Sequence, residues 1–267
     1  MGLAIGAALL VSVVIVAVLV GALPFLKASQ KQPSYLAKLG VNQAEWAYES
    51  PTLSTHTARG QYFLWLNVSV NNSGTHSLGV EGFGFKLRWK GETAGVPGSY
   101  AWSSFDLAPG RSTNVTIAFP SAGLKTPDLL DFQYSPSGAS HVQASVPAPF
   151  APATEVTFGA SSAQWKNNDT YGRPPIAGNR FLWLAFEMRN AWDQSAVITV
   201  SYFKAEGLSG SIYSALQQQG AVEIAPGGRG NATLVFQVPT TWIPKVLHYD
   251  MTIGPWADMA IATPSGP

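Results

Sequence analysis

The stretch Gly60-Gln-Tyr-Phe-Leu-Trp-Leu66 decides the fold, because the chain contains it twice, the second time as Gly178-Asn-Arg-Phe-Leu-Trp-Leu184. Other segments recur at the same spacing to within one residue: Ala44-Glu-Trp46 as Ala163-Gln-Trp165, Leu107-Ala-Pro-Gly110 as Ile224-Ala-Pro-Gly227, and Asn114-Val-Thr-Ile-Ala-Phe119 as Asn231-Ala-Thr-Leu-Val-Phe236. A spacing that persists along most of the repeat indicates a duplicated domain.

Both copies alternate apolar and polar residues with the two-residue period of a half-buried strand. Val68 and Val70 are predicted to face the core in the first copy, and Phe186 and Met188 in the second. Further strands are expected near 83–89, 113–119 and 130–134, with counterparts near 197–203, 232–238 and 247–253. About seven short strands per copy predict an all-β protein made of two tandem immunoglobulin-like β-sandwiches.

The sandwiches are expected to follow one N-terminal transmembrane helix. Residues 2–26 carry no charge and are mostly apolar. A helix of that length spans roughly 37 Å, which exceeds a hydrocarbon core of about 30 Å. The predicted order is a transmembrane helix at 1–26, a polar stalk at 27–35, the first sandwich at 36–146, a proline-rich linker at 147–154, the second sandwich at 155–262 and a tail at 263–267.

Two signals disagree on which side of the membrane the sandwiches lie. Lys27, Lys31 and Lys38 follow the apolar segment and favour a cytoplasmic C-terminal side. Five N-x-[ST] acceptors favour the outside: Asn67, Asn71, Asn114, Asn168 and Asn231. We give the acceptors more weight, so the cell membrane is the expected location, with the sandwiches extracytoplasmic and glycans as candidate modifications.

Composition narrows the functional classes. The chain has no cysteine, which excludes disulfides, thiolate metal sites and a cysteine nucleophile. Its formal net charge is +1 and it has no basic block, so nucleic acid is not an expected partner. No motif predicts a catalytic, cofactor-binding or metal-binding residue.

The repeated pattern resembles a family of immunoglobulin-like domains of unknown function found in surface proteins and lipoproteins of bacteria and archaea. The resemblance rests on the segment Gly60-x-x-Phe-Leu-Trp-Leu-x-Val-x-Val-x-Asn72, the Leu-x-Pro-Gly turn and a strand that ends as Phe236-Gln-Val-Pro239. It covers both copies and implies an extracytoplasmic location without a known activity. The chain departs from many relatives in having an apolar segment where they have a lipid-anchored cysteine.

The nine tryptophans divide into shared and unshared positions. Those that recur in both copies are assigned to packing: Trp46, Trp65, Trp165 and Trp183. Four unshared tryptophans near predicted turns are the candidate contact aromatics: Trp102, Trp192, Trp242 and Trp256. Such rings are suited to contact with a partner or a sugar face.

The favoured interpretation is a membrane-anchored structural or interaction protein without catalytic activity and without a cofactor, whose partners are other membrane or surface proteins. A second hypothesis is an accessory subunit of a larger membrane complex, because Gly2, Gly6, Ala7 and Ala8 permit close helix packing. A third is a pilin-like surface filament subunit, which also joins an apolar helix to a β-domain.

Overall fold

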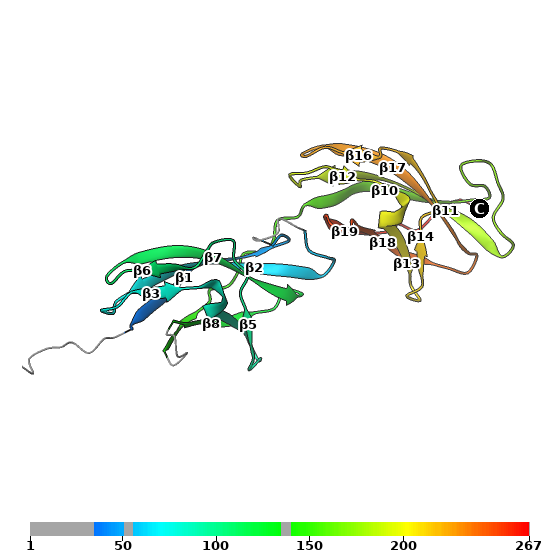
Figure 1. The fold of residues 1–267 in the computed structure, drawn as a ribbon. Helices are drawn as coiled ribbons and strands as arrows, with labels where there is room; N and C mark the ends of the chain where they lie inside the picture. Colours follow the sequence, from blue (N-terminus) through cyan, green and yellow to red (C-terminus); the bar gives the residue numbers. More distant parts are fainter. Residues whose placement is uncertain (1–34, 51–55, 135–139, 267) are drawn as a thin grey trace, which may run out of the picture.

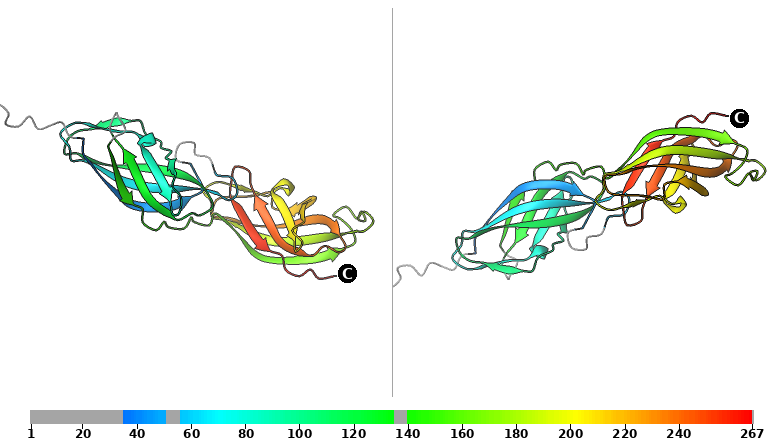
Figure 2. Two further views of the ribbon diagram at one scale, coloured as in Figure 1. Left: turned by 90° about the horizontal axis from the view of Figure 1, so that it is seen from below. Right: turned by 90° about the horizontal axis from the view of Figure 1, so that it is seen from above.

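The computed structural model describes residues 35–50, 56–134 and 140–266, and these form two antiparallel β-sandwiches arranged end to end (Figure 1). The first described residues lie at one end of the molecule and the C-terminus lies at the other (Figure 2). Within these three ranges no helix is long and apolar enough to cross a membrane. The expected helix at 1–26 lies outside the described residues, as does the stalk up to residue 34.

The first sandwich packs a three-stranded sheet, in the order β1-β2-β7, against a four-stranded sheet, in the order β5-β4-β8-β9. A short β3-β6 pair lies beside them. The elements are β1 Ala37–Ala47, β2 Gln61–Asn72, β3 Leu78–Val80, η1 Gly82–Gly84, β4 Phe85–Trp89, β5 Gly95–Pro97, β6 Phe105–Leu107, β7 Ser112–Ala122, β8 Pro127–Gln133 and β9 His141–Ser145.

The second sandwich repeats this plan with sheets in the orders β10-β11-β17-β15 and β14-β13-β18-β19, together with a β12-β16 pair. The elements are β10 Val156–Lys166, β11 Asn179–Asn190, β12 Ala196–Val197, η2 Val200–Tyr202, β13 Phe203–Gly207, β14 Ile212–Ser214, β15 Gln217–Gly220, β16 Glu223–Ile224, β17 Arg229–Pro239, β18 Pro244–Asp250 and β19 Trp256–Ala260. In both sandwiches the strand order is consistent with an immunoglobulin-like fold.

The strand expected near 197–203 is corrected by the structure. The backbone N–H of Tyr202 bonds to the Thr199 carbonyl oxygen at 3.1 Å and closes the short 3₁₀ turn η2. The chain turns there, so the strand β13 begins only at Phe203. Its counterpart η1 likewise delays β4 to Phe85.

Each core is built around the repeated segment. The inward side chains of β2, which include Val68 and Val70, are fully buried. On β11, Phe186 is 3% exposed and Met188 is fully buried, as the alternation predicts. Burial of such a side chain contributes roughly 1.5–3 kcal/mol, so these central strands anchor both sandwiches.

The segment after each sandwich returns to that sandwich's first strand. Phe150 of the linker forms a parallel bridge with β1, because its N–H bonds to the Ala44 carbonyl oxygen and its carbonyl oxygen accepts the Trp46 N–H, both at 3.0 Å. Ser265 contacts β10 in the same way, between Ala163 at 3.0 Å and Trp165 at 2.8 Å. The linker and the C-terminal segment are therefore structurally equivalent.

Candidate functional site

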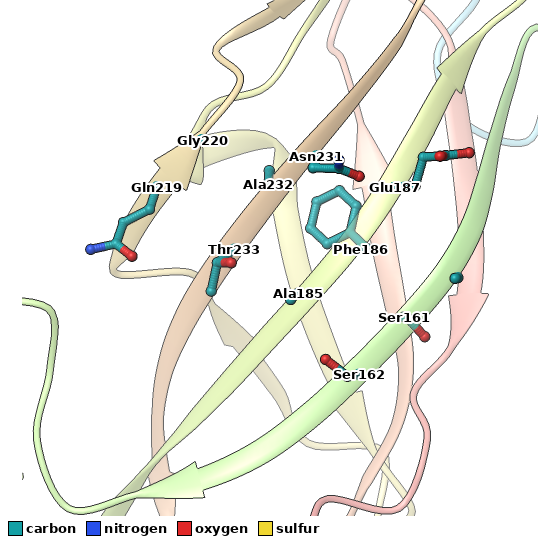
Figure 3. Close-up of a pocket in the computed structure, with 11 residues that line it drawn as sticks. Ser161, Ser162, Ala185, Phe186, Glu187, Gln219, Gly220, Asn231, Ala232 and Thr233 are labelled. Atoms are coloured by element: carbon teal, nitrogen blue, oxygen red, sulfur yellow. The ribbon is translucent and has the colours of Figure 1, made fainter.

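A polar row crosses the outer face of the β10-β11-β17-β15 sheet in the second sandwich. Strand register places Ser162 beside Ala185, Ala185 beside Thr233, and Thr233 beside Gln219. Figure 3 shows these four positions with Asn231 of β17 close by. Because alternate residues of a strand share a face, the row is presented to solvent while its neighbours fill the core.

This face is hollowed. A cavity of about 510 Å³ lies over Ala185, Glu187 and Asn231. A second hollow of about 250 Å³ shares Ala185 and Thr233 and extends to Trp183. We call the two together the outer groove. Its floor is low because Ala185 has only a methyl side chain and because β10 bulges at the small residues between Phe158 and Ser161.

The corresponding face of the first sandwich is filled. Asn67 stands at the position of Ala185, and β1 bulges at Asn42. The Asn42 amide donates to Asn67 Oδ1 at 2.9 Å and to Asn114 Oδ1 at 3.4 Å. Duplication has therefore left one face closed by an asparagine cluster and the other open. This difference makes the outer groove the candidate functional site.

The chemistry of the groove suits hydrogen bonding to polar, uncharged groups. It offers hydroxyls from Ser162 and Thr233 and amides from Gln219 and Asn231. Glu187 supplies a carboxylate, which accepts a hydrogen bond from Arg189 Nε at 2.8 Å. That hydrogen bond outweighs the opposing effect of burial and, with the positive charges of Arg189 and Arg229, holds the pKa of Glu187 below its usual range.

One end of the groove is closed by Trp183. Its indole N–H donates to the Asn168 carbonyl oxygen at 3.0 Å, and Lys166 Nζ lies 3.8 Å from the ring centroid. Trp65 takes the equivalent position in the first sandwich and donates to the Glu49 carbonyl oxygen at 2.9 Å. Both rings are half-buried.

The other shared tryptophans lie deeper. Trp46 is 7% exposed and stacks on Trp89 with ring centroids 5.8 Å apart. Trp165 is 8% exposed and is covered by the Arg180 guanidinium, whose carbon lies 3.4 Å from the ring centroid. These two rings are packing residues.

The five acceptor asparagines differ in accessibility. Asn114, Asn168 and Asn231 are exposed. Asn67 and Asn71 are half-buried, and their amides are engaged, Asn67 with Asn42 and Asn71 with Ser112 Oγ at 2.7 Å. The Asn231 acceptor opens into the outer groove, since Asn231 and Thr233 both line it.

Two of the unshared tryptophans pack against their own sandwich, and for Trp242 the burial corrects the expectation of a contact surface. Trp242 is 5% exposed because it occupies the space above Gly207. Gly207 is the last residue of β13, the position that Trp89 holds in β4. Each sandwich therefore buries one indole at this place, but the indole comes from β4 in the first sandwich and from the loop before β18 in the second. Trp102 is half-buried against the first core and donates to the Thr116 carbonyl oxygen at 3.1 Å.

The other two unshared tryptophans do make contacts, and the surface that they contact is the first sandwich of the same chain. The Trp256 ring lies 4.8 Å from that of Tyr48 and 5.6 Å from that of Tyr62. Trp192 is 7% exposed and stands edge-on to His56, with centroids 5.9 Å apart. They belong to the joint between the sandwiches.

Comparisons with known proteins give fold-level likenesses. No family model matches the chain, and no curated protein matches it. An uncharacterized β-sandwich protein from Clostridium difficile 630 matches at 12% identity and a TM-score of 0.26, over 41% of this chain and 87% of its own. Bovine butyrophilin matches at 8% identity and a TM-score of 0.25, over 85% of this chain and 99% of its own. Neither likeness adds to what the strand order and the cores establish.

Proposed function

We propose that the protein is a membrane-anchored, extracytoplasmic interaction protein of the immunoglobulin-like kind that its sequence resembles. It acts without catalysis as an arm that holds the outer groove of the second sandwich away from the anchor. The observation that supports this is the end-to-end arrangement, in which the first described residues and the second sandwich lie at opposite ends (Figure 2).

The joint supports an arm rather than two independently moving domains. Phe150 ties the linker to β1, which leaves only a few residues before Glu155 enters the second sandwich. Arg59 of the first sandwich also forms an ion pair with Asp258 of the second. A short tether with contacts on both of its sides restricts the angles that the second sandwich can sample.

The location is tested by cysteine labelling, because the chain has no native cysteine to react. A Ser209→Cys variant, at an exposed position of the second sandwich, is treated in intact cells with a maleimide that cannot cross membranes. We expect it to be labelled, while a Gly2→Cys variant is labelled only after permeabilisation. The reverse pattern would place the sandwiches in the cytoplasm and overturn the proposal.

The interaction is tested by a photo-crosslinking residue at Gln219, in the outer groove, with Lys204 on the opposite sheet as the matched exposed control. We expect cross-linked products from position 219 and fewer from 204. Cross-linked products with one defined membrane protein would support the accessory-subunit hypothesis. Ladders that contain only this chain would support the filament hypothesis. Equal yields at both positions would contradict the groove as the interaction face.

A further inference from the structure

Among the described residues, two separate groups of polar contacts lie at the joint between the sandwiches. In the first, Arg59 pairs with Asp258 of β19 and donates to the Tyr249 carbonyl oxygen at 3.2 Å. In the second, His56 Nε2 lies 2.6 Å from Glu155 Oε2. Glu155 belongs to the second sandwich, because its carbonyl oxygen accepts the Ala191 N–H at 2.7 Å. Both groups therefore cross from one sandwich to the other.

His56 is enclosed by aromatic rings from both sandwiches. Its side chain is 1% exposed. It stacks on Tyr48 of the first sandwich, with ring centroids 5.4 Å apart and an interplanar angle of 11°. Trp192 and Trp256 of the second sandwich approach it edge-on, at 5.9 Å and 5.4 Å. The stacked Tyr48 face favours a cationic ring.

The hydrogen bonds of His56 require the protonated, cationic form of its imidazole ring. Nδ1 lies 2.9 Å from the Thr57 carbonyl oxygen, and Nε2 faces the Glu155 carboxylate. A carbonyl oxygen and an ionised carboxylate can only accept, so both ring nitrogens have to carry a proton. A neutral imidazole has one N–H, and one of the two contacts would then bring a lone pair against an acceptor.

The charges around His56 are negative. Glu155 faces it from the linker end, Glu49 from the end of β1, and the hydroxyls of Tyr48 and Tyr62 lie in the same aromatic cluster. Asp193 lines an adjoining hollow of about 340 Å³ together with Glu49 and Glu155. Burial lowers the pKa of His56, but the hydrogen bonds to Glu155 and Thr57 and the two glutamate charges outweigh it, so the pKa lies above its ordinary value.

The second histidine of the joint, His248, is paired with acids of its own sandwich, although its Nδ1 also lies 3.3 Å from Arg59 Nη2 of the first sandwich. His248 lies between Asp258 at 2.7 Å and Glu206 at 3.1 Å, and both acids belong to the second sandwich. Arg59 keeps its charge at any physiological pH, so its pair with Asp258 persists when histidines lose their protons. In the part of the chain that the structure describes, His56 is thus the histidine whose acid partner lies across the joint.

We propose that His56 and Glu155 form a proton-dependent latch that holds the two sandwiches in the extended arrangement. When His56 loses its proton, the pair no longer holds, and the second sandwich pivots about the Arg59–Asp258 pair. The adjoining hollow leaves room for this movement. Because the folded pKa is raised, the latch is fully closed below the ordinary pKa of histidine and opens as the pH rises through the higher folded pKa.

The test measures the distance between the sandwiches in the full chain. Spin labels are attached to a Lys90→Cys, Gln194→Cys variant, at one exposed position in each sandwich, and no native cysteine competes for them. We expect one narrow distance distribution at about pH 5. At about pH 8.5 the population at other distances should be roughly fivefold larger than at about pH 5.

Variants separate the latch from a general effect of pH. With His56→Gln or Glu155→Gln, the distribution at about pH 5 should already match that of the unsubstituted joint at about pH 8.5. Glu155→Gln leaves the buried ring in place, so it tests the latch even where His56→Gln perturbs folding. His141→Gln is the matched control, because His141 pairs with Asp131 at 2.9 Å within the first sandwich, and it should respond to pH like the parent. A parent distribution that is the same at both pH values, or a pH response that survives both latch variants, would overturn the proposal.

Discussion

The buried side-chain amides of Asn72 and Asn190 occupy equivalent positions at the ends of β2 and β11 and make the same set of bonds. Asn190 Nδ2 donates to the carbonyl oxygens of Gln194 at 2.7 Å and Ile224 at 2.9 Å, and its Oδ1 accepts the Trp192 N–H at 3.0 Å. Asn72 makes the corresponding three bonds in the first sandwich. One side chain thus satisfies three backbone groups of the loops at that end of each sandwich.

Replacing Asn190 with alanine should lower the free energy of unfolding by about 2–4 kcal/mol, because it leaves these backbone groups without a partner. Urea denaturation measures the change. Asn167→Ala, at an exposed position in the same sandwich, should have almost no effect. Similar losses in both variants would mean that the three hydrogen bonds do not carry the stability assigned to them.

Asp169 should make the second sandwich sensitive to strong acid. Oδ1 accepts the N–H groups of Tyr171 at 2.8 Å and Arg173 at 2.9 Å, and Oδ2 accepts Arg173 Nε at 2.8 Å and Gln217 Nε2 at 2.9 Å. Burial raises the pKa of Asp169, but these hydrogen bonds outweigh it and bring the pKa to about 2. Its contribution to stability is therefore present above pH 3.8 and is lost as the pH falls through about 2.

In urea titrations at several pH values, Asp169→Asn should be less stable than the parent at neutral pH, and the difference should shrink as the pH falls below about 4. Glu223→Gln, at an exposed position, should follow the parent throughout. A difference between Asp169→Asn and the parent that does not depend on pH would show that the carboxylate charge is not the stabilising feature.

The second sandwich buries the indole of Trp242 where the first buries that of Trp89. We therefore expect that the effects of substitutions at Gly207 and Trp242 on stability are not additive. A Cβ at Gly207 would lie 2.2 Å from Trp242 Nε1, so Gly207→Ala should destabilise the protein by about 1–3 kcal/mol through overpacking. Adding Trp242→Leu removes the indole and leaves the Ile243 carbonyl oxygen, 2.9 Å from the added Cβ, as the smaller obstacle. In a double-mutant cycle measured by urea denaturation, the double variant should lose less than the two single losses combined, and strict additivity would be the contrary result.

Glycosylation, if the sandwiches are extracytoplasmic as proposed, should favour Asn168 and Asn231. Both are exposed, and neither side chain has a hydrogen-bond partner among the described residues, whereas Asn67 and Asn71 are engaged within the sheet face. Peptide mass spectrometry of protein from native membranes measures the occupancy of each site. Full occupancy of Asn67 would contradict this order, since Asn67 is half-buried and its Oδ1 is held by the Asn42 amide.

The sequence predicted the two sandwiches because a strand's side-chain period is visible in one segment. The alternation that follows Phe63-Leu-Trp-Leu66 and its copy requires no knowledge of distant residues, and it correctly predicted that Val68, Val70, Phe186 and Met188 are buried. The strand near 197–203 was wrong because a single backbone hydrogen bond at Tyr202 decides where the chain turns. Apolar residues in a 3₁₀ turn have no signature that separates them from a short strand.

The outer groove and the joint depend on residues that are far apart in sequence. Ser162, Ala185, Thr233 and Gln219 become neighbours only through strand register. A residue-by-residue comparison of the two repeats offers one signal, because Ala185 stands where the first copy has Asn67. The burial of Trp192 has no such signal, since it depends on how one sandwich docks against the other.

The return of Phe150 to β1 has a mechanical consequence. Tension along the chain enters the first sandwich at the start of β1 and leaves through the segment beyond Phe150. These two segments run parallel, so a stretching force slides them past each other and loads the bonds to Ala44 and Trp46 together rather than one after another. Ser265 and β10 repeat the arrangement, so a chain that is pulled from its two ends would resist at two shear clamps in series.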